Sequence, residues 1–73
     1  MAKLEFIQSC EIAERNGNEL NFEVSEVVKQ WMEAHMTEVD DELERKFGET
    51  PHTIRFENFF NGEEDAYICE CYF

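Results

Sequence analysis

Basic side chains are scarce in this 73-residue sequence, which holds six Lys and Arg against 18 Asp and Glu. The formal net charge is -12 at pH 7. Direct binding to DNA, RNA or an anionic membrane depends on Lys and Arg side chains that displace counterions from phosphate groups. The shortage of basic residues therefore argues against nucleic acid and membrane surfaces as direct partners, and it favours a basic protein.

Long apolar runs are also missing. No stretch approaches the roughly 18 apolar residues that a membrane-spanning helix needs, and the first residues lack the apolar core of a secretory signal. The cysteines are odd in number and follow no regular disulfide framework: Cys10, Cys69 and Cys71. We therefore expect a cytoplasmic protein whose reduced thiols pack as small apolar groups.

Motifs for catalysis or metal binding are absent. The three glycines belong to turns or to a helix end and form no phosphate-binding loop, and neither a nucleophile elbow nor a zinc-protease helix occurs. Cys69 and Cys71 are separated by one residue, whereas cysteine ligands of structural zinc are usually separated by two to four. The segment from Asp40 to Glu42 lacks the glycine of a calcium loop. We expect no enzyme activity, no cofactor and no metal.

Apolar and aromatic residues are abundant enough for a folded domain. They make up 42% and 14% of the chain, respectively, and disordered chains are poor in aromatics. A chain of this length supports one hydrophobic core. We therefore expect a single domain over residues 1–73.

The only long helical period lies in Ser25–Phe47. Its apolar side chains fall on one face about 140° wide, and they are Val28, Trp31, Met32, His35, Met36, Val39 and Leu43. Ser25 suits the N-cap position, because its hydroxyl can accept a hydrogen bond from the first turn, and Gly48 suits the left-handed position after the helix. Thr37 followed by Asp40 resembles a second capping signal. The segment is therefore either one continuous helix or a helix kinked near Thr37.

Alternating patterns on both sides of this helix predict β-strands. In Lys3–Glu14 the apolar residues Leu4, Phe6, Cys10 and Ile12 occupy even positions, a period of two. Three further strands are predicted, and two Asn-Gly pairs provide hairpin turns; the strands are Glu19–Val24, His52–Phe60 and Ala66–Phe73. The predicted fold is α+β: a β-hairpin, a central helix and a second hairpin, with the helix packed on one face of a four-stranded antiparallel sheet.

Carboxylates provide the main functional signal. They form a row on the polar side of the predicted helix, with two flanking residues, and a second cluster after the Asn61-Gly62 turn. Along the helix, steps of four and seven residues are roughly 6 and 10 Å, so these carboxylates could occupy positions that a basic groove offers to phosphates. The predicted partner-binding residues are Glu26, Glu33, Glu38, Asp40, Asp41, Glu44, Glu63, Glu64 and Asp65.

In size, charge and coarse helix and strand content the chain is similar to the small acidic nucleic-acid mimics that bacteriophages use against restriction, CRISPR or DNA-repair enzymes. That resemblance implies an inhibitor or regulator, of the anti-CRISPR or anti-restriction type, which occupies the basic nucleic-acid-binding surface of a target protein or nuclease complex. Two other interpretations stay open. One is a structural or adaptor protein that dimerises through an edge strand or an aromatic face and uses its charge for solubility. The other is an acidic halophilic domain. Both a monomer and a homodimer are compatible with the sequence.

Overall fold

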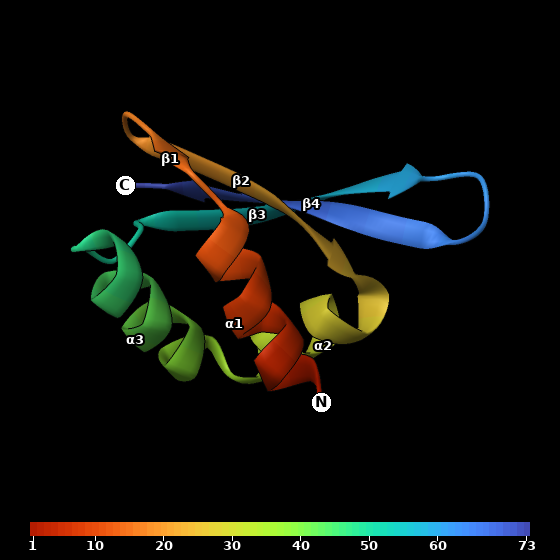
Figure 1. Ribbon diagram of the computed structural model, residues 1–73, viewed down its shortest axis with the longest axis horizontal. Helices are drawn as coiled ribbons and strands as arrows, with labels where there is room; N and C mark the ends of the chain where they lie inside the picture. Colours follow the sequence, from red (N-terminus) through yellow and green to blue (C-terminus); the bar gives the residue numbers. More distant parts are fainter.

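The computed structural model describes all 73 residues (Figure 1). Four strands form one antiparallel sheet in the order β1-β2-β4-β3, and the three helices lie on one side of it (Figure 1). The predicted α+β class with a four-stranded antiparallel sheet is confirmed. In chain order the elements are α1 (Ala2–Ile12), β1 (Arg15–Asn16), β2 (Glu19–Ser25), α2 (Glu26–Ala34), α3 (Met36–Phe47), β3 (Thr53–Phe60) and β4 (Asp65–Tyr72).

The first element, α1, is a helix, so the strand predicted over Lys3–Glu14 is wrong. Its buried residues are Phe6 and Cys10, which lie one helical turn apart. The Phe6 ring lies 5.7 Å, between centroids, from the ring of Trp31. Leu4 and Ile12, which completed the alternating pattern, are exposed, Ile12 to 85%. The alternating pattern that predicted a strand therefore depended on two apolar residues that face solvent. The helix instead buries Phe6 inside the domain.

The remaining strands lie close to their predicted positions, and β4 is central in the sheet. It pairs with β2 on one side and with β3 on the other. β1 is only two residues long and pairs with the start of β2. The C-terminal strand is therefore unable to accept a further strand, and the long open edge of the sheet belongs to β3.

The long predicted helix is divided into α2 and α3, which meet at His35. His35 has a non-helical backbone (φ -131°, ψ 45°), and its N–H bonds to the Met32 carbonyl at 3.2 Å. The kinked alternative is thus confirmed, although the break precedes Thr37 and no side chain caps α3. His35 was expected on the apolar face, yet it is exposed and its ring stacks on Trp31 at 4.9 Å between centroids.

The outer ends of this helical pair agree with the sequence. The Ser25 hydroxyl accepts a hydrogen bond from the Val28 N–H at 3.2 Å, which satisfies a backbone donor of the first turn. Gly48 takes φ 88° after α3, a left-handed conformation that suits glycine because it has no Cβ.

The hydrophobic core lies between the helices and the sheet. It draws alternate residues from β2 and β4 and one stripe from each helix, and its members are Phe6, Cys10, Leu20, Phe22, Val24, Val28, Met32, Val39, Leu43, Cys69 and Cys71. The three cysteines are buried free thiols, as expected. None of the three helices combines the length and the apolar character needed to cross a membrane.

Candidate functional site

Ion pairs use five of the six basic side chains of the chain. Because each pair takes a different carboxylate, 18 less five leaves 13 acidic side chains with no basic group within 4.0 Å. The five pairs are Lys3–Glu38, Arg15–Glu49, Lys29–Glu33, Arg45–Glu42 and Arg55–Glu70. The positions of the unpaired carboxylates therefore decide where the excess charge can act.

Unpaired acidic residues gather around the turn between β3 and β4. Two adjoining hollows of about 480 and 230 Å³ lie there, and both are lined by Ser25, Glu64 and Asp65. No Lys or Arg lines either hollow. We call this surface the acidic end, and its acidic residues are Glu5, Glu23, Glu26, Glu63, Glu64 and Asp65.

The β3–β4 turn holds its carboxylates in a defined conformation. The side-chain oxygen of Asn61 accepts hydrogen bonds from the N–H groups of Glu63 and Glu64, at 3.1 and 3.0 Å. Gly62 takes φ 99°, which a residue with a Cβ rarely adopts. The Asn-Gly pair thus orders the segment that presents Glu63, Glu64 and Asp65 to solvent.

Strand pairing brings the other residues of the acidic end to this turn. Ser25, the last residue of β2, pairs with Ala66 near the start of β4. This register places Glu26, the first residue of α2, beside the turn, where it lines the larger hollow. Glu5 and Ser9 of α1 line the smaller hollow from the other side. Three parts of the chain that are distant in sequence, α1, the junction of β2 with α2, and the β3–β4 turn, therefore build one surface.

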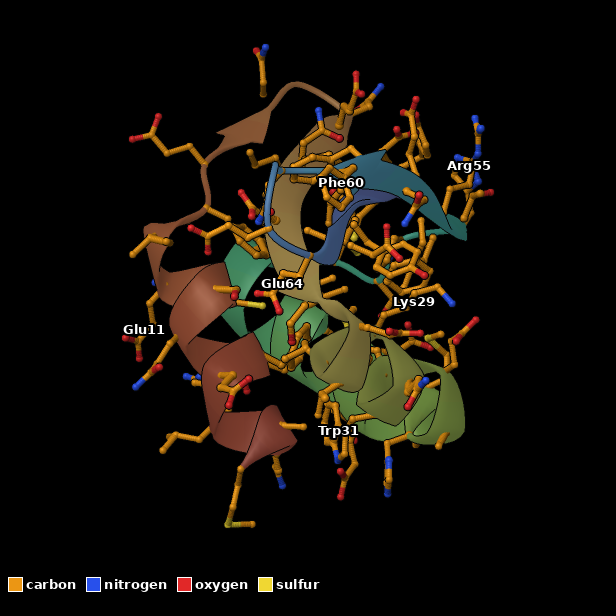
Figure 2. All side chains as sticks on the ribbon, turned by 90° about the vertical axis from the view of Figure 1, so that its right-hand side faces the viewer. Glu11, Lys29, Trp31, Arg55, Phe60 and Glu64 are labelled. Carbon is orange, nitrogen blue, oxygen red and sulfur yellow. The ribbon has the colours of Figure 1, made fainter.

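Two exposed apolar side chains accompany these carboxylates. Phe60 and Val27 line the larger hollow and are 66% and 63% exposed. In Figure 2, which looks onto this end of the molecule, Phe60 and Glu64 face the viewer, whereas Lys29 and Arg55 lie to one side. An aromatic anchor within a polar rim is typical of protein–protein contact surfaces.

The structure separates the predicted binding residues into groups. Glu33 and Glu38 are paired with Lys29 and Lys3, at 2.9 and 3.8 Å. Glu44 accepts a hydrogen bond from the Thr50 hydroxyl at 3.1 Å. Consequently only Glu26, Glu63, Glu64 and Asp65 of the predicted residues belong to the acidic end.

Asp40 and Asp41 each line a different hollow, and both hollows are separate from the acidic end. Asp40 lies beside His52, and Asp41 shares a hollow with Trp31 and the basic residue Arg45. Together with Glu44 we call them the α3 carboxylates. The break at His35 therefore divides the acidic row that was predicted along one helix.

Sequence reasoning missed Glu5, Glu23 and Val27 at the acidic end. Glu5 lies in the segment that was predicted as a strand, and neither Glu23 nor Val27 is among the predicted binding residues. All three approach Glu64 only because β2 pairs with β4 and α1 packs beside them. No local sequence pattern carries that information.

The groups with shifted pKa lie away from the acidic end. Burial raises the pKa of the Cys10 thiol to about 12, so this thiol is protonated and unreactive at neutral pH. The Tyr72 hydroxyl donates to Glu70 at 2.7 Å and lowers the pKa of that carboxyl. No group of three or more His, Cys, Asp and Glu side chains is arranged to hold a metal ion.

The acidic end thus combines a concentration of carboxylates, an absence of basic neighbours and an exposed aromatic ring. Such a surface is complementary to a basic surface that offers an apolar contact. Comparison of the chain with protein-family models, with curated protein sequences and with solved structures finds no match.

Proposed function

We propose that this protein is a small inhibitory or regulatory binding protein that occupies the basic nucleic-acid-binding surface of a target protein or nuclease complex. The observation that carries this proposal is the acidic end, where acidic residues from α1, β2, α2 and the β3–β4 turn meet without one Lys or Arg among them. A surface that served solubility alone would be expected to have both signs of charge interspersed.

Electrostatics would supply the first stage of binding. A net charge of -12 attracts a basic groove over long range and speeds encounter. The same groove binds nucleic acid through Lys and Arg contacts to phosphates, so the carboxylates and the nucleic acid compete for the same basic side chains. The protein would therefore inhibit by occupying the groove.

Phe60 and Val27 would supply the second stage. Both are exposed next to the carboxylates of the larger hollow, and burial of an apolar side chain at a partner surface adds short-range affinity that salt does not screen. The absence of basic neighbours distinguishes the acidic end from the α3 carboxylates. Near the latter, the hollow that contains Asp41 also contains Lys3 and Arg45, which weaken the local negative field.

Capture and competition test the proposal. The protein is immobilised and exposed to a nuclease-treated bacterial lysate, and each retained nucleic-acid-binding protein is then purified. Its affinity for a labelled duplex is measured with and without the soluble chain. We expect the chain to displace the duplex, and we expect displacement to weaken when salt is raised to about 0.5 M, where the screening length is about 4 Å. Retained proteins that keep their duplex in the presence of the chain would contradict the proposal.

A matched pair of variants locates the contact. Glu63→Lys, Glu64→Lys and Asp65→Lys together raise the formal net charge by six from -12, and so do Asp40→Lys, Asp41→Lys and Glu44→Lys. We expect the first triple variant to compete at least about tenfold more weakly, which corresponds to about 1.4 kcal/mol, and the second to compete within a few fold of the parent protein. Equal weakening by both would show that only total charge matters.

A further inference from the structure

The longest open edge of the sheet is the full length of β3, whereas on the opposite side β1 pairs with Glu19 and Leu20 of β2. α1 and α2 pack on β2 and β4, and the only element with extensive contacts to β3 is β4. An uncovered edge strand offers unpaired backbone N–H and C=O groups to any strand that can align with it. Two properties of β3 indicate what pairs with this edge: which of its residues direct their N–H and C=O groups outward, and which side chains it carries.

The hydrogen-bonding phase follows from the turn. The Asn61 N–H bonds to the Glu64 carbonyl at 3.3 Å, so the paired residues Phe60 and Asp65 do not bond to each other. In an antiparallel ladder this alternation continues residue by residue. Ile54, Phe56 and Asn58 therefore direct their N–H and C=O groups away from β4, toward the open edge.

We propose that β3 pairs antiparallel with β3 of a second copy of this chain, with Phe56 opposite Phe56 of the partner. In this register Ile54 faces the partner's Asn58, so that the three outward-bonding residues of each strand meet each other. The result is one continuous eight-stranded sheet. Because the two-fold axis is perpendicular to the sheet, the helices of both copies lie on the same side.

Charge selects this register over its neighbours. With Phe56 opposite Phe56, Arg55 lies opposite Glu57 of the partner, and Glu57 opposite the partner's Arg55, at non-hydrogen-bonded positions where side chains approach most closely. A shift by one residue pair in either direction would place Arg55 opposite Arg55, or Glu57 opposite Glu57. Like charges directly opposite each other are destabilising.

The local charge also favours a second copy at this edge. Although the chain has only six basic residues, two of them lie here: Arg55 on β3, and Lys29, whose Nζ is 5.5 Å from the centroid of the Phe56 ring. Each is paired with a carboxylate of its own chain, Arg55 with Glu70 and Lys29 with Glu33, so these two carboxylates leave no unopposed charge at this edge. This edge differs from the acidic end, so the dimer does not depend on the proposed function.

Charge exchange tests the register. The mass in solution is measured by analytical ultracentrifugation over a concentration series, with folding checked by circular dichroism. We expect a monomer–dimer equilibrium for the parent chain, and an increase of at least about tenfold in the dimer Kd for Arg55→Glu or Glu57→Arg alone. The double variant, which exchanges the two charges, should restore the dimer. A merely structural role of these side chains would not produce that rescue.

Backbone chemistry gives an independent arm. Asn58→Pro removes an N–H that points to the open edge, a position where a strand tolerates proline, and Asn58→Ala keeps that N–H. We expect the proline variant to be monomeric and the alanine variant to dimerise. A chain that stays monomeric up to about 1 mM, or a dimer indifferent to these substitutions, would overturn the inference. Added salt should strengthen the dimer by screening net repulsion, whereas it should weaken binding to a basic target.

Discussion

The two ends of the sheet differ in how their charged side chains are paired. At the end near β1, the Arg15 guanidinium donates to the carbonyls of Gly17 and Phe47, at 2.8 and 3.2 Å, and bonds to Glu49 at 2.9 Å. It also lies 4.2 Å from the centroid of the Phe73 ring. One basic side chain thus joins the first hairpin, the end of α3 and the C-terminus.

The acidic end has no such residue. Its carboxylates come from α1, β2, α2 and the β3–β4 turn and meet no basic group, and its aromatic residue, Phe60, is exposed instead of covered by a cation. The acid excess is therefore not distributed evenly. Arg15 joins three segments at one end of the sheet, and unpaired carboxylates are concentrated at the other.

The largest expected effect is the loss of stability when Phe6, which holds α1 at the acidic end, is truncated. Phe6, which is 1% exposed, anchors α1 and with it Glu5. Phe6→Ala should lower the free energy of unfolding by about 3 to 4 kcal/mol. Leu4→Ala, at an exposed position of the same helix, should change it by less than about 0.5 kcal/mol. Chemical denaturation measures both, and equal losses would contradict a helical α1.

The next largest effect is the loss of stability expected when Arg15, at the end of the sheet near β1, is truncated. Arg15→Ala removes three hydrogen bonds and a cation–π contact, so the free energy of unfolding should fall by about 2 kcal/mol. Lys46→Ala removes a basic residue that forms no ion pair and serves as the control, with an expected change below about 0.5 kcal/mol. Similar losses in both variants would mean that net charge, and not the contacts of Arg15, holds this end.

A smaller effect concerns the melting temperature, which should change in opposite directions when unpaired and ion-paired carboxylates are neutralised. Neutralising the unpaired Glu63, Glu64 and Asp65 as Gln, Gln and Asn should raise the melting temperature by a few degrees at low salt, because it relieves self-repulsion. Neutralising the paired Glu42 and Glu49 should lower the melting temperature, because it removes ion-pair partners. Thermal unfolding at low and high salt distinguishes the two, and a rise in both variants would argue that pairing is irrelevant.

The smallest effect concerns a carboxylate with a neutral partner. The Tyr72 hydroxyl holds the pKa of Glu70 below its ordinary value of 4.5, so the ionised carboxylate is stabilised in the folded protein. That contribution is present above about pH 4.5 and is lost as the pH falls through the lowered pKa. Tyr72→Phe should therefore reduce stability slightly at pH 7, and the difference from the parent protein should shrink in acid. A difference that is constant with pH would contradict this linkage.

Much of the fold could be predicted because its signals are local. The strand pattern of Glu19–Val24, the cap at Ser25 and the glycine at 48 each depend on neighbours within a few residues, and all are present in the structure. The first segment could not be assigned correctly. Leu4 and Ile12 suggested alternation there, and only the contacts of Phe6 with other elements revealed which of the apolar residues are buried.

The candidate site was predicted in part for the same reason. Glu63, Glu64 and Asp65 are consecutive, so their clustering is visible in the sequence. Their association with Glu5 and Glu26 depends on the pairing of β2 with β4 and on the place of α1. The row predicted along one helix failed as a continuous surface because the backbone at His35 leaves the helical conformation.

The sign and size of the charge, the hairpin turns, the alternation of β2 and the apolar stripes of α2 and α3 can all be read from the chain, since these properties depend on composition or on near neighbours. The three-dimensional fold is needed to know which carboxylates meet a cation, which strand lies at the open edge and which aromatic residue stays exposed. Those outcomes depend on contacts between segments far apart in the chain. Ion pairs and strand pairs act over a few ångströms in space, at any separation along the sequence.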